Sequence, residues 1–500
     1  MSRFEVKKTI ECDVLLVGGG CAGTVAAIEA KNQGANVLLI DKSIKAKRGG
    51  NSRYSGGYFR MAFEDGADSL LPVVEGSPLP DGELVVEPYS KSAYYNKVIT
   101  LSDGVADKTF TEIFVDRSLD TAKWMREQGV VWGINPCQIY EKDGHLVCPS
   151  GATMLEAKGA GEGLMEMLYT IVEKKNIPIM YETPARELIV DSSGTVTGVI
   201  AQDKDGYLQI NAKSVILACG GNQASPDYRR KYLGEGWDLV RVRGTRYNTG
   251  DGINMAVDIG AATSGHWGGC HASMIAEDTP MVEAAGEGSE RYSYPYSIMV
   301  SREGKRFVDE GYDRQPFTYA RFGKELLKLP GHVGFQIYDK KITDTPLFRV
   351  EYHEAEGVIA DTLEEVAEAM GIDVEQFMKT VNEFNAAVKD DIPFAAYKYD
   401  GKRTVGLDID KTNWAQKIDT PPYRGYAVVC GLTMTYGGLK VNVKAQVIDT
   451  GDKPIKGLYA IGESSGGFFG NNYPSGSGLT RGAVFGRIAA TEAVAFSKNK

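Results

Sequence analysis

Three glycines near the N-terminus have a spacing that suits a bound pyrophosphate: Gly18, Gly20 and Gly23. The first permits a tight turn, the second lets a phosphate approach the backbone, and the third lets a helix pack on a strand. Asp41 follows Gly23 by 18 residues, a distance at which a carboxylate can accept hydrogen bonds from ribose hydroxyls. These residues predict a dinucleotide site, whose phosphates would also face the positive end of the helix.

Two more glycine-rich segments carry small polar side chains. Residues 48–52 supply a glycine pair with an amide and a hydroxyl, which suits a pyrophosphate that leads towards a flavin ring. Residues 473–479 open an expected helix that runs to about residue 495, and its N-terminus would stabilise negative charge on a reduced ring. The structural alternatives are a surface loop and a helix that only packs. The cofactor candidates here are Gly49, Gly50, Asn51, Ser52, Glu463, Ser477, Gly478 and Leu479.

A strand, a helix and a second strand are expected around the first glycines, at residues 14–17, 22–33 and 37–40. Apolar strand patterns return at 215–218 and 457–461. A nicotinamide domain would be complete within roughly 150 residues, whereas here roughly the last 60 residues complete the fold. This organisation favours FAD over NAD.

The stretch before the last strand is more mixed and predicts an inserted domain with amphipathic helices at 361–370 and 374–388. We therefore expect an α/β protein with two domains, a Rossmann-like FAD domain of the glutathione-reductase type and an α+β capping domain. The expected FAD domain comprises residues 1–264 and 435–500, and the capping domain residues 265–434. Residues 65–82, rich in glycine and proline, predict a long loop.

Composition excludes several classes of partner. The net charge is −10 and no cluster of Lys and Arg stands out, which argues against nucleic acid or an anionic membrane surface. No run of 18 apolar residues occurs and residues 1–11 lack an apolar core, so neither a membrane span nor a signal peptide is expected. The seven cysteines show no Cys-x-x-Cys spacing, which predicts reduced thiols, no metal site and a cytoplasmic protein.

Several segments together resemble the fumarate reductase/succinate dehydrogenase flavoprotein superfamily. They are the first glycine motif and residues 48–52, 215–221, 248–252, 302–310 and 457–487. Within the superfamily the sequence looks most like FAD-dependent tricarballylate dehydrogenases, through residues 413–416, 437–441 and 472–480. The resemblance implies a FAD domain built from both chain ends, a capping domain, and a buried substrate cleft between them.

The resemblance also adds cofactor residues, namely Lys42, Ala185, Gly220, Gly221 and Asp251. No histidine lies at 46–60, where relatives that bind FAD covalently place one, so non-covalent FAD is expected. The family's substrate-binding arginine falls at Tyr473 and one of its histidines falls near Met434, which makes fumarate itself a poor match.

Arg314 is the leading acid–base candidate, because the resemblance implies an arginine eight residues after that of a Gly-x-Arg-Phe pattern, here Arg306. An arginine needs a desolvated site and a relay partner for this role, and Asp313 and Glu310 are the neighbouring candidates. The alternative is that Arg314 only binds a carboxylate or an internal acid.

A ring-ketone dehydrogenase or enone reductase is the first rival, with Tyr473, Tyr436 or Tyr319 as acid and base. A carboxylate substrate instead needs cationic partners, and the candidates are His271, Arg243, Arg246, Arg314 and His353. His271 corresponds loosely to a substrate-binding histidine of the superfamily, and a structural histidine is an equal alternative.

The leading expectation is hydride transfer between FAD and a CH–CH bond next to a carboxylate, most like the oxidation of tricarballylate to cis-aconitate. The alternatives are a 3-ketosteroid-like dehydrogenase or enone reductase, and a fumarate-reductase-like reductase of an unsaturated acid. A flavin sensor without substrate chemistry is disfavoured, because it would not need a capping domain of roughly 170 residues. Electrons would pass to a separate carrier, for which a quinone, an iron–sulfur protein and oxygen are the candidates.

Overall fold

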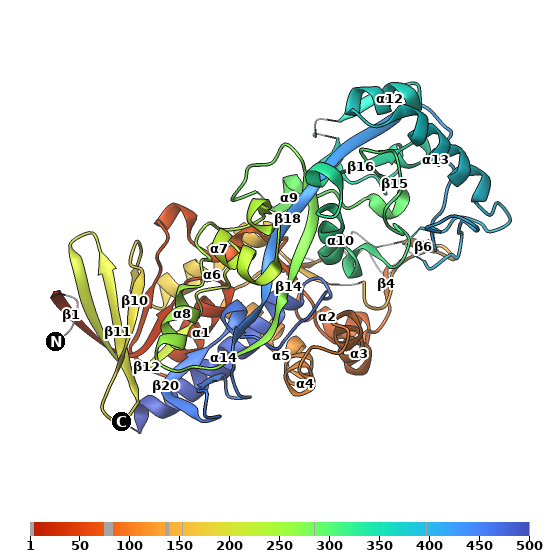
Figure 1. Cartoon of the computed structure of the whole chain (residues 1–500). Coiled ribbons are helices and arrows are strands. Elements are labelled where there is room, and N and C mark those ends of the chain that lie inside the picture. The colour runs from red at the N-terminus through yellow and green to blue at the C-terminus, as the bar shows by residue number, and fades with distance from the viewer. Residues whose placement is uncertain are drawn as a thin grey trace. The chain divides into compact units, whose positions relative to one another are not determined.

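The computed structural model describes residues 5–74, 84–135, 140–152, 154–284, 286–353, 355, 357–396 and 398–499. The chain forms two compact units. Unit 1 comprises Met1–Asp238, Gly244–Cys270 and Met434–Lys500, and unit 2 comprises Leu239–Arg243 and His271–Thr433. Figure 1 shows the chain. The FAD-binding role of residues 1–264 and 435–500 and the capping role of residues 265–434 stay predictions.

The eight-stranded sheet of unit 1 has the order β10-β11-β12-β1-β2-β9, with β20 beside β12 and β19 beside β20. The parallel strands that matter here are β1 (Val6–Val17), β2 (Val37–Ile40), β12 (Gly206–Leu217) and β20 (Pro454–Ala460). Their carboxyl ends are in register, since Val17 pairs with Ile40 and Leu217, and Leu217 pairs with Ala460. The segments that follow these strands therefore start from one edge of the sheet.

The apolar runs of the sequence form strands that are buried on both faces. Val14 and Leu15 of β1 point to opposite faces and neither has any exposed surface. Helix α1 (Cys21–Asn32) packs against α14 (Ser477–Lys498), where a Cβ atom at Gly486 would lie 2.9 Å from the Ala22 carbonyl oxygen. The two helices predicted here are confirmed, with ends shifted by a few residues.

The other elements of unit 1 surround this sheet or extend it. The remaining strands of the sheet are β9 (Ile179–Met180), β10 (Ala185–Val190), β11 (Val196–Asp203) and β19 (Gln446–Ile448). The further elements are β3 (Tyr58–Phe59), α2 (Ala67–Leu70), β4 (Leu84–Val86), α3 (Lys91–Leu101), α4 (Lys108–Asp116), α5 (Ser118–Gln128), β5 (Trp132–Ile134), β6 (Tyr140–Lys142), β7 (His145–Cys148), β8 (Leu155–Ala157), α6 (Ala160–Lys174), α7 (Pro226–Tyr228) and α8 (Asp251–Asp258).

The loop predicted at 65–82 is wrong near its start. Residues of α2 form a helical turn there, because Leu70 is fully buried and holds the turn against the core. Residues 75–82 lie outside the described residues. None of the helices in the described part of the chain is long and apolar enough to cross a membrane.

Unit 2 is built on a six-stranded sheet of order β13-β18-β16-β15, in which β14 and β17 also pair with β18. Its strands are β13 (Arg241–Val242), β14 (Thr263–Ala276), β15 (Ile298–Ser301), β16 (Val333–Tyr338), β17 (Val358–Ala360) and β18 (Tyr423–Leu439), and β14 and β18 contain residues of both units. Its helices are α9 (Gly286–Ser289), α10 (Tyr319–Leu326), α11 (Lys340–Thr343), α12 (Leu363–Met370) and α13 (Val374–Ala387). Val366 and Phe377 pack with Phe335 in one core, so the two amphipathic helices predicted in this stretch are confirmed.

Candidate active site

The first glycine turn connects β1 to α1 at the carboxyl edge of the unit 1 sheet. Gly18 has φ of +108°, and a side chain there or at Gly23 would collide with a backbone carbonyl. Gly20 differs, because a Cβ atom added to it would meet nothing closer than the Ser52 hydroxyl at 3.7 Å. Gly20 is also the N-cap of α1 and no side chain caps the helix, so the space beside it suits a phosphate.

Asp41 follows β2 and lies beside the glycine turn. Its Oδ2 accepts a hydrogen bond from the Gly19 N–H at 2.8 Å, and its Oδ1 accepts one from the Ser43 N–H at 2.8 Å. A carboxylate has about four acceptor positions, so two remain for ribose hydroxyls. The Thr183 N–H donates to the Asp41 carbonyl at 2.9 Å, two residues before Ala185 begins β10.

Lys42 contacts the other cofactor candidate predicted at the start of α8. Its ammonium donates to Asp251 Oδ2 at 2.7 Å and to Thr249 Oγ1 at 2.6 Å. Burial would raise the pKa of Asp251, but the charge of Lys42 outweighs it and holds that pKa below its usual value. The structure therefore brings Lys42 and Asp251 together as an ion pair.

The second glycine loop lies against the first. The Cys21 N–H donates to Ser52 Oγ at 3.1 Å, and a Cβ atom on Gly50 would lie 3.6 Å from the Gly20 Cα. Gly49 precedes Gly50 in the same turn, and Asn51 Oδ1 accepts from the Thr245 N–H at 2.9 Å. The loop thus lines the space beside Gly20, as expected for a pyrophosphate.

Glu463, just after β20, lies beside Gly221, which follows β12. Its Oε1 accepts from the Thr435 N–H at 2.8 Å, and its Oε2 accepts from Gln223 Nε2 at 3.3 Å. Burial raises the pKa of Glu463 to about 7, although these hydrogen bonds and Arg481 lower it. The Gly220 carbonyl accepts from Ser464 Oγ at 3.0 Å, so both sequence motifs meet at this edge.

The N-terminus of α14 is held by buried polar groups that the sequence motifs did not reveal. Arg60 is fully buried and donates from Nε to the Ser475 carbonyl at 2.6 Å, while Thr480 Oγ1 donates back to the Arg60 carbonyl at 2.7 Å. Ser477 Oγ lies 2.7 Å from the Tyr94 hydroxyl. The N–H groups of Gly478 and Leu479 in the first turn make this end electropositive.

The tyrosine candidates of unit 1 lie close to this helix end. A Cβ atom on Gly478 would lie 3.9 Å from Tyr473 Cε2, and the Tyr473 ring centroid is 5.2 Å from that of Phe469. The Tyr436 ring is 6.2 Å from the same phenylalanine. Tyr436 and Tyr473 are therefore both adjacent to Phe469 in unit 1.

An orphaned buried atom provides a test of whether these residues fit FAD. Asn222 Nδ2 is buried and makes no hydrogen bond with the described residues. The room at Gly20 and the two helix N-termini without side-chain caps add further polar groups that can bind a large ligand. The residues present fit a dinucleotide with a polar ring system.

Arg314 lies in unit 2 and is half-buried. Its guanidinium carbon lies 4.8 Å from the centre of the Tyr399 ring, and the Tyr399 hydroxyl donates to Asp313 Oδ1 at 2.6 Å. Glu310, one of the expected relay partners, is bound by Arg306 through both of its oxygens. Asp313 is therefore the better placed of the two candidates.

The other unit 2 candidates form a buried cluster. The His271 ring meets the Tyr319 ring edge-on at 4.8 Å, and Tyr319 meets Tyr292 at 5.1 Å. Burial, with the nearby charge of Arg243, holds the pKa of His271 well below its usual value. A neutral imidazole can donate a hydrogen bond to a carboxylate, but it carries no positive charge to attract it.

Arg243 is also in this cluster, where it forms a buried ion pair with Glu290, a residue that sequence reasoning missed. Burial raises the pKa of Glu290, although Arg243 lowers it. The two remaining cations proposed for a carboxylate, Arg246 and His353, are exposed. Of the described residues, no group of three or more His, Cys, Asp or Glu could hold a metal ion.

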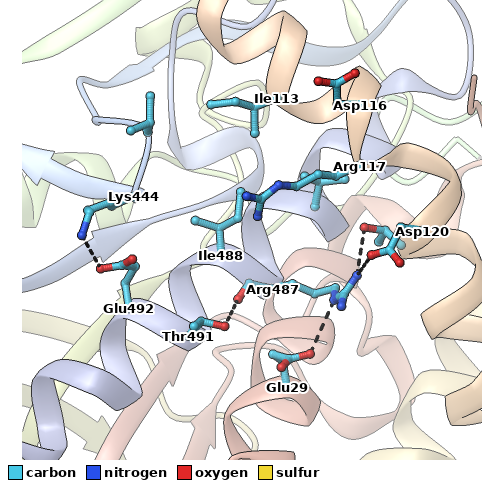
Figure 2. A pocket seen from close by; sticks show the side chains of 13 residues that line it. Glu29, Ile113, Asp116, Arg117, Asp120, Lys444, Arg487, Ile488, Thr491 and Glu492 are labelled. Atoms are coloured by element: carbon cyan, nitrogen blue, oxygen red, sulfur yellow. Dashed lines mark hydrogen bonds and ion pairs between the residues drawn. The ribbon is translucent and has the colours of Figure 1, made fainter. Parts of the chain in front are cut away.

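A cavity of about 560 Å³ on unit 1 contains none of these candidates. Figure 2 shows that its charged side chains are largely paired with each other, since Arg487 contacts Asp120 and Glu29, and Lys444 contacts Glu492. Its walls come from α1, α4, α5 and α14 and from the turn before β19.

Glycine turns and helix N-termini at the edge of a parallel sheet define a dinucleotide-binding α/β protein. The sequence model of the FAD binding domain matches residues 13–479, so the chain belongs to this family, within the fumarate reductase/succinate dehydrogenase flavoprotein superfamily. The chain is 28% identical over 494 residues to a probable fumarate reductase of Shewanella frigidimarina, covering 97% of this chain and 75% of that protein. It is 28% identical over 507 residues to urocanate reductase of Eggerthella lenta, covering 98% and 75%.

Solved structures show the same fold. The open conformation of a flavocytochrome c3 fumarate reductase matches with a TM-score of 0.74 at 25% identity, over 98% of this chain and 79% of that one. The 3-ketosteroid Δ1-dehydrogenase of Sterolibacterium denitrificans matches with 0.72 at 20% identity, over 97% and 99%. The predicted α/β fold class is confirmed. The chain is a flavin-dependent oxidoreductase that acts on CH–CH groups.

Proposed function

We propose that the chain reduces a carbon–carbon double bond conjugated with a carboxylate. The expectation of tricarballylate oxidation has less support, because the relatives at 28% identity are reductases of fumarate and urocanate. The structural observation that carries the proposal is Arg314, a cation that stacks on Tyr399, whose hydroxyl donates to the neighbouring Asp313.

Bound FAD would supply the hydride, which leaves the chain to bind the cofactor and deliver a proton to the adjacent carbon. Gly20 and residues 49–52 would hold the pyrophosphate, and Asp41 the ribose. Arg314 would bind the carboxylate and donate the proton, with Asp313 as the group that returns a proton to it. Tyr399 orients both, through ring stacking and a hydrogen bond.

Two alternatives remain, one with other acid–base residues and one in the reverse direction. An enone or ring ketone would take its proton from Tyr473, Tyr436 or Tyr319 and would need no cation. Tricarballylate oxidation is the same reaction in reverse, in which Arg314 would remove a proton. We keep the cytoplasm as the location, and a quinone or an iron–sulfur protein as the separate redox partner.

A substrate panel tests the proposal. The anaerobically reduced holoenzyme is mixed with fumarate, urocanate, cis-aconitate or a ring enone, and the return of the oxidised flavin absorbance is followed by stopped flow. The oxidised enzyme is mixed with tricarballylate in parallel. Rapid reoxidation by an unsaturated acid is the expected result. Reoxidation by the enone alone would contradict the proposal and favour the tyrosine mechanism.

We expect the purified protein to be yellow and to release intact FAD when precipitated with acid. The reason is that residues 46–60 contain no histidine to form a covalent flavin bond. The supernatant is analysed for FAD by chromatography. Flavin that stays with the precipitate would show that the non-covalent assignment is wrong.

Replacement of Asp41 by alanine should weaken FAD binding by roughly 10- to 100-fold, since each charge-assisted hydrogen bond is worth about 1.5–3 kcal/mol. Retention of flavin after dialysis and titration of the apoprotein measure this. Asp449→Ala is a matched control, because Asp449 Oδ1 also accepts two backbone hydrogen bonds, from Gly451 at 2.8 Å and Lys453 at 2.9 Å. Equal retention in both variants would remove Asp41 from the site.

A further inference from the structure

Arg481, in the second turn of α14, is a buried cation without an ion pair. Its relative exposure is 4%, and its guanidinium carbon lies 4.7 Å from the centre of the Phe468 ring. Nη1 donates to the Ser465 carbonyl at 3.1 Å, whereas Nε makes no hydrogen bond. No carboxylate among the residues that the structure describes lies within salt-bridge distance of it.

The charge of Arg481 persists at neutral pH. Burial lowers the pKa of Arg481 to about 10, while Glu463, Tyr436 and Tyr473 raise it. The Glu463 oxygens are instead bound by Thr435 and Gln223. Because an unpaired buried charge is costly, the site calls for an anion that comes from outside the chain.

The surroundings indicate which anion fits. Phe469 lies next to the cation and to both candidate tyrosines, with the Arg481 guanidinium carbon 5.3 Å from its ring centre and the Tyr473 ring 5.2 Å away. Aromatic walls accommodate the carbon chain of an organic acid, and the guanidinium and phenol groups offer hydrogen bonds to its oxygens. We infer that Arg481 binds a carboxylate group of the substrate and so selects unsaturated acids over neutral ketones.

This inference rests on the proposed function, and ligand binding to the oxidised holoenzyme tests it without turnover. The probes are fumarate and urocanate with their neutral amides, fumaramide and urocanamide, and the signal is the change in flavin absorbance. Arg481→Met should weaken binding of the acids roughly 10- to 100-fold and leave the amides unchanged. Arg481→Lys keeps the charge but not the bidentate geometry, so its affinity for the acids should lie between those of the wild type and Arg481→Met.

Arg487→Met is the matched control, because Arg487 is on the same helix but pairs with Asp120 at 2.8 Å at the cavity of Figure 2. It should bind every probe as the wild type does. FAD content and thermal stability are measured for each variant, and Arg481→Lys provides the test if Arg481→Met does not fold.

Three results would overturn the inference, and they are distinguishable. If Arg481→Met still binds the acids and the wild type reduces them, Arg481 does not bind the substrate carboxylate, and the proposed function still stands. A changed flavin reduction potential with unchanged acid affinity would show that the cation serves the cofactor instead. A wild type that binds and reduces only neutral ketones would reject the proposed function together with this inference.

Discussion

Arg314→Lys should slow reoxidation of the reduced flavin by a saturating unsaturated acid by roughly 10²–10⁴-fold, the loss typical of a missing general acid. A lysine keeps the charge, but its ammonium would lie at a different distance from the substrate and has a different pKa. It would also lose the stacking contact with Tyr399. If Arg314 only anchors a carboxylate, the same variant would mainly raise KM and leave the saturated rate nearly unchanged.

The control for this prediction is Arg302→Lys. Arg302 is an exposed arginine of unit 2 whose guanidinium carbon lies 5.5 Å from the centre of the Phe335 ring and whose Nη1 donates to the Gly371 carbonyl at 3.3 Å. Its replacement tests the loss of stacking and of one exposed hydrogen bond. Rapid-reaction kinetics should show a wild-type rate for it. Wild-type rates in both Arg314→Lys and Arg314→Ala would exclude either role for Arg314, and Tyr473, Tyr436 and Tyr319 would become the leading acids.

The glycine turns at the sheet edge of unit 1 were predictable because their signals are local in sequence. Gly18, Gly20 and Gly23 lie within six residues, and their spacing suggests that Gly18 and Gly23 have no room for a side chain while Gly20 leaves room for a phosphate. The position of Asp41 after the glycine motif follows from the combined length of one helix and one strand. The parallel strands follow from apolar runs, because burial on both faces removes the usual alternation.

Other site residues were not predictable because their partners lie far away in the chain. Arg60 binds the backbone of residue 475, and Glu290 pairs with Arg243, so no spacing rule points to either. Arg481 did leave a signal, as a cation between the small and apolar residues 477–480 and 482–486 that follow the last glycine motif. The acid–base assignment depends on distances between side chains from separate segments of the chain. Spacing within the sequence does not give these distances.

Glu310→Ala should destabilise unit 2 by about 3–5 kcal/mol, the usual cost of breaking a buried ion pair. Glu310 is fully buried, and it binds Arg306 Nη2 at 2.6 Å and the Met299 N–H at 2.7 Å. Its removal would leave Arg306 and the buried Lys411 as cations without this carboxylate. Burial lowers the pKa of Lys411 to about 8 even with Glu310 present, which indicates how poorly the site tolerates charge.

The pH dependence of unfolding gives this prediction a second measurement. Burial would raise the pKa of Glu310, but Arg306 and Lys411 outweigh it and hold that pKa below its usual value of 4.5. The unfolded chain therefore binds this proton more readily, so the stabilisation is complete above about pH 4.5 and is lost as the pH falls through the folded pKa. Urea midpoints of the holoenzyme followed by circular dichroism should show this loss in the wild type and not in Glu310→Ala.

Glu383→Ala is the control, because it removes an exposed pair with Lys379 at 3.9 Å and should change the urea midpoint little. Equal midpoints for the two variants would mean that other groups compensate Arg306, and the buried pair would then not stabilise unit 2.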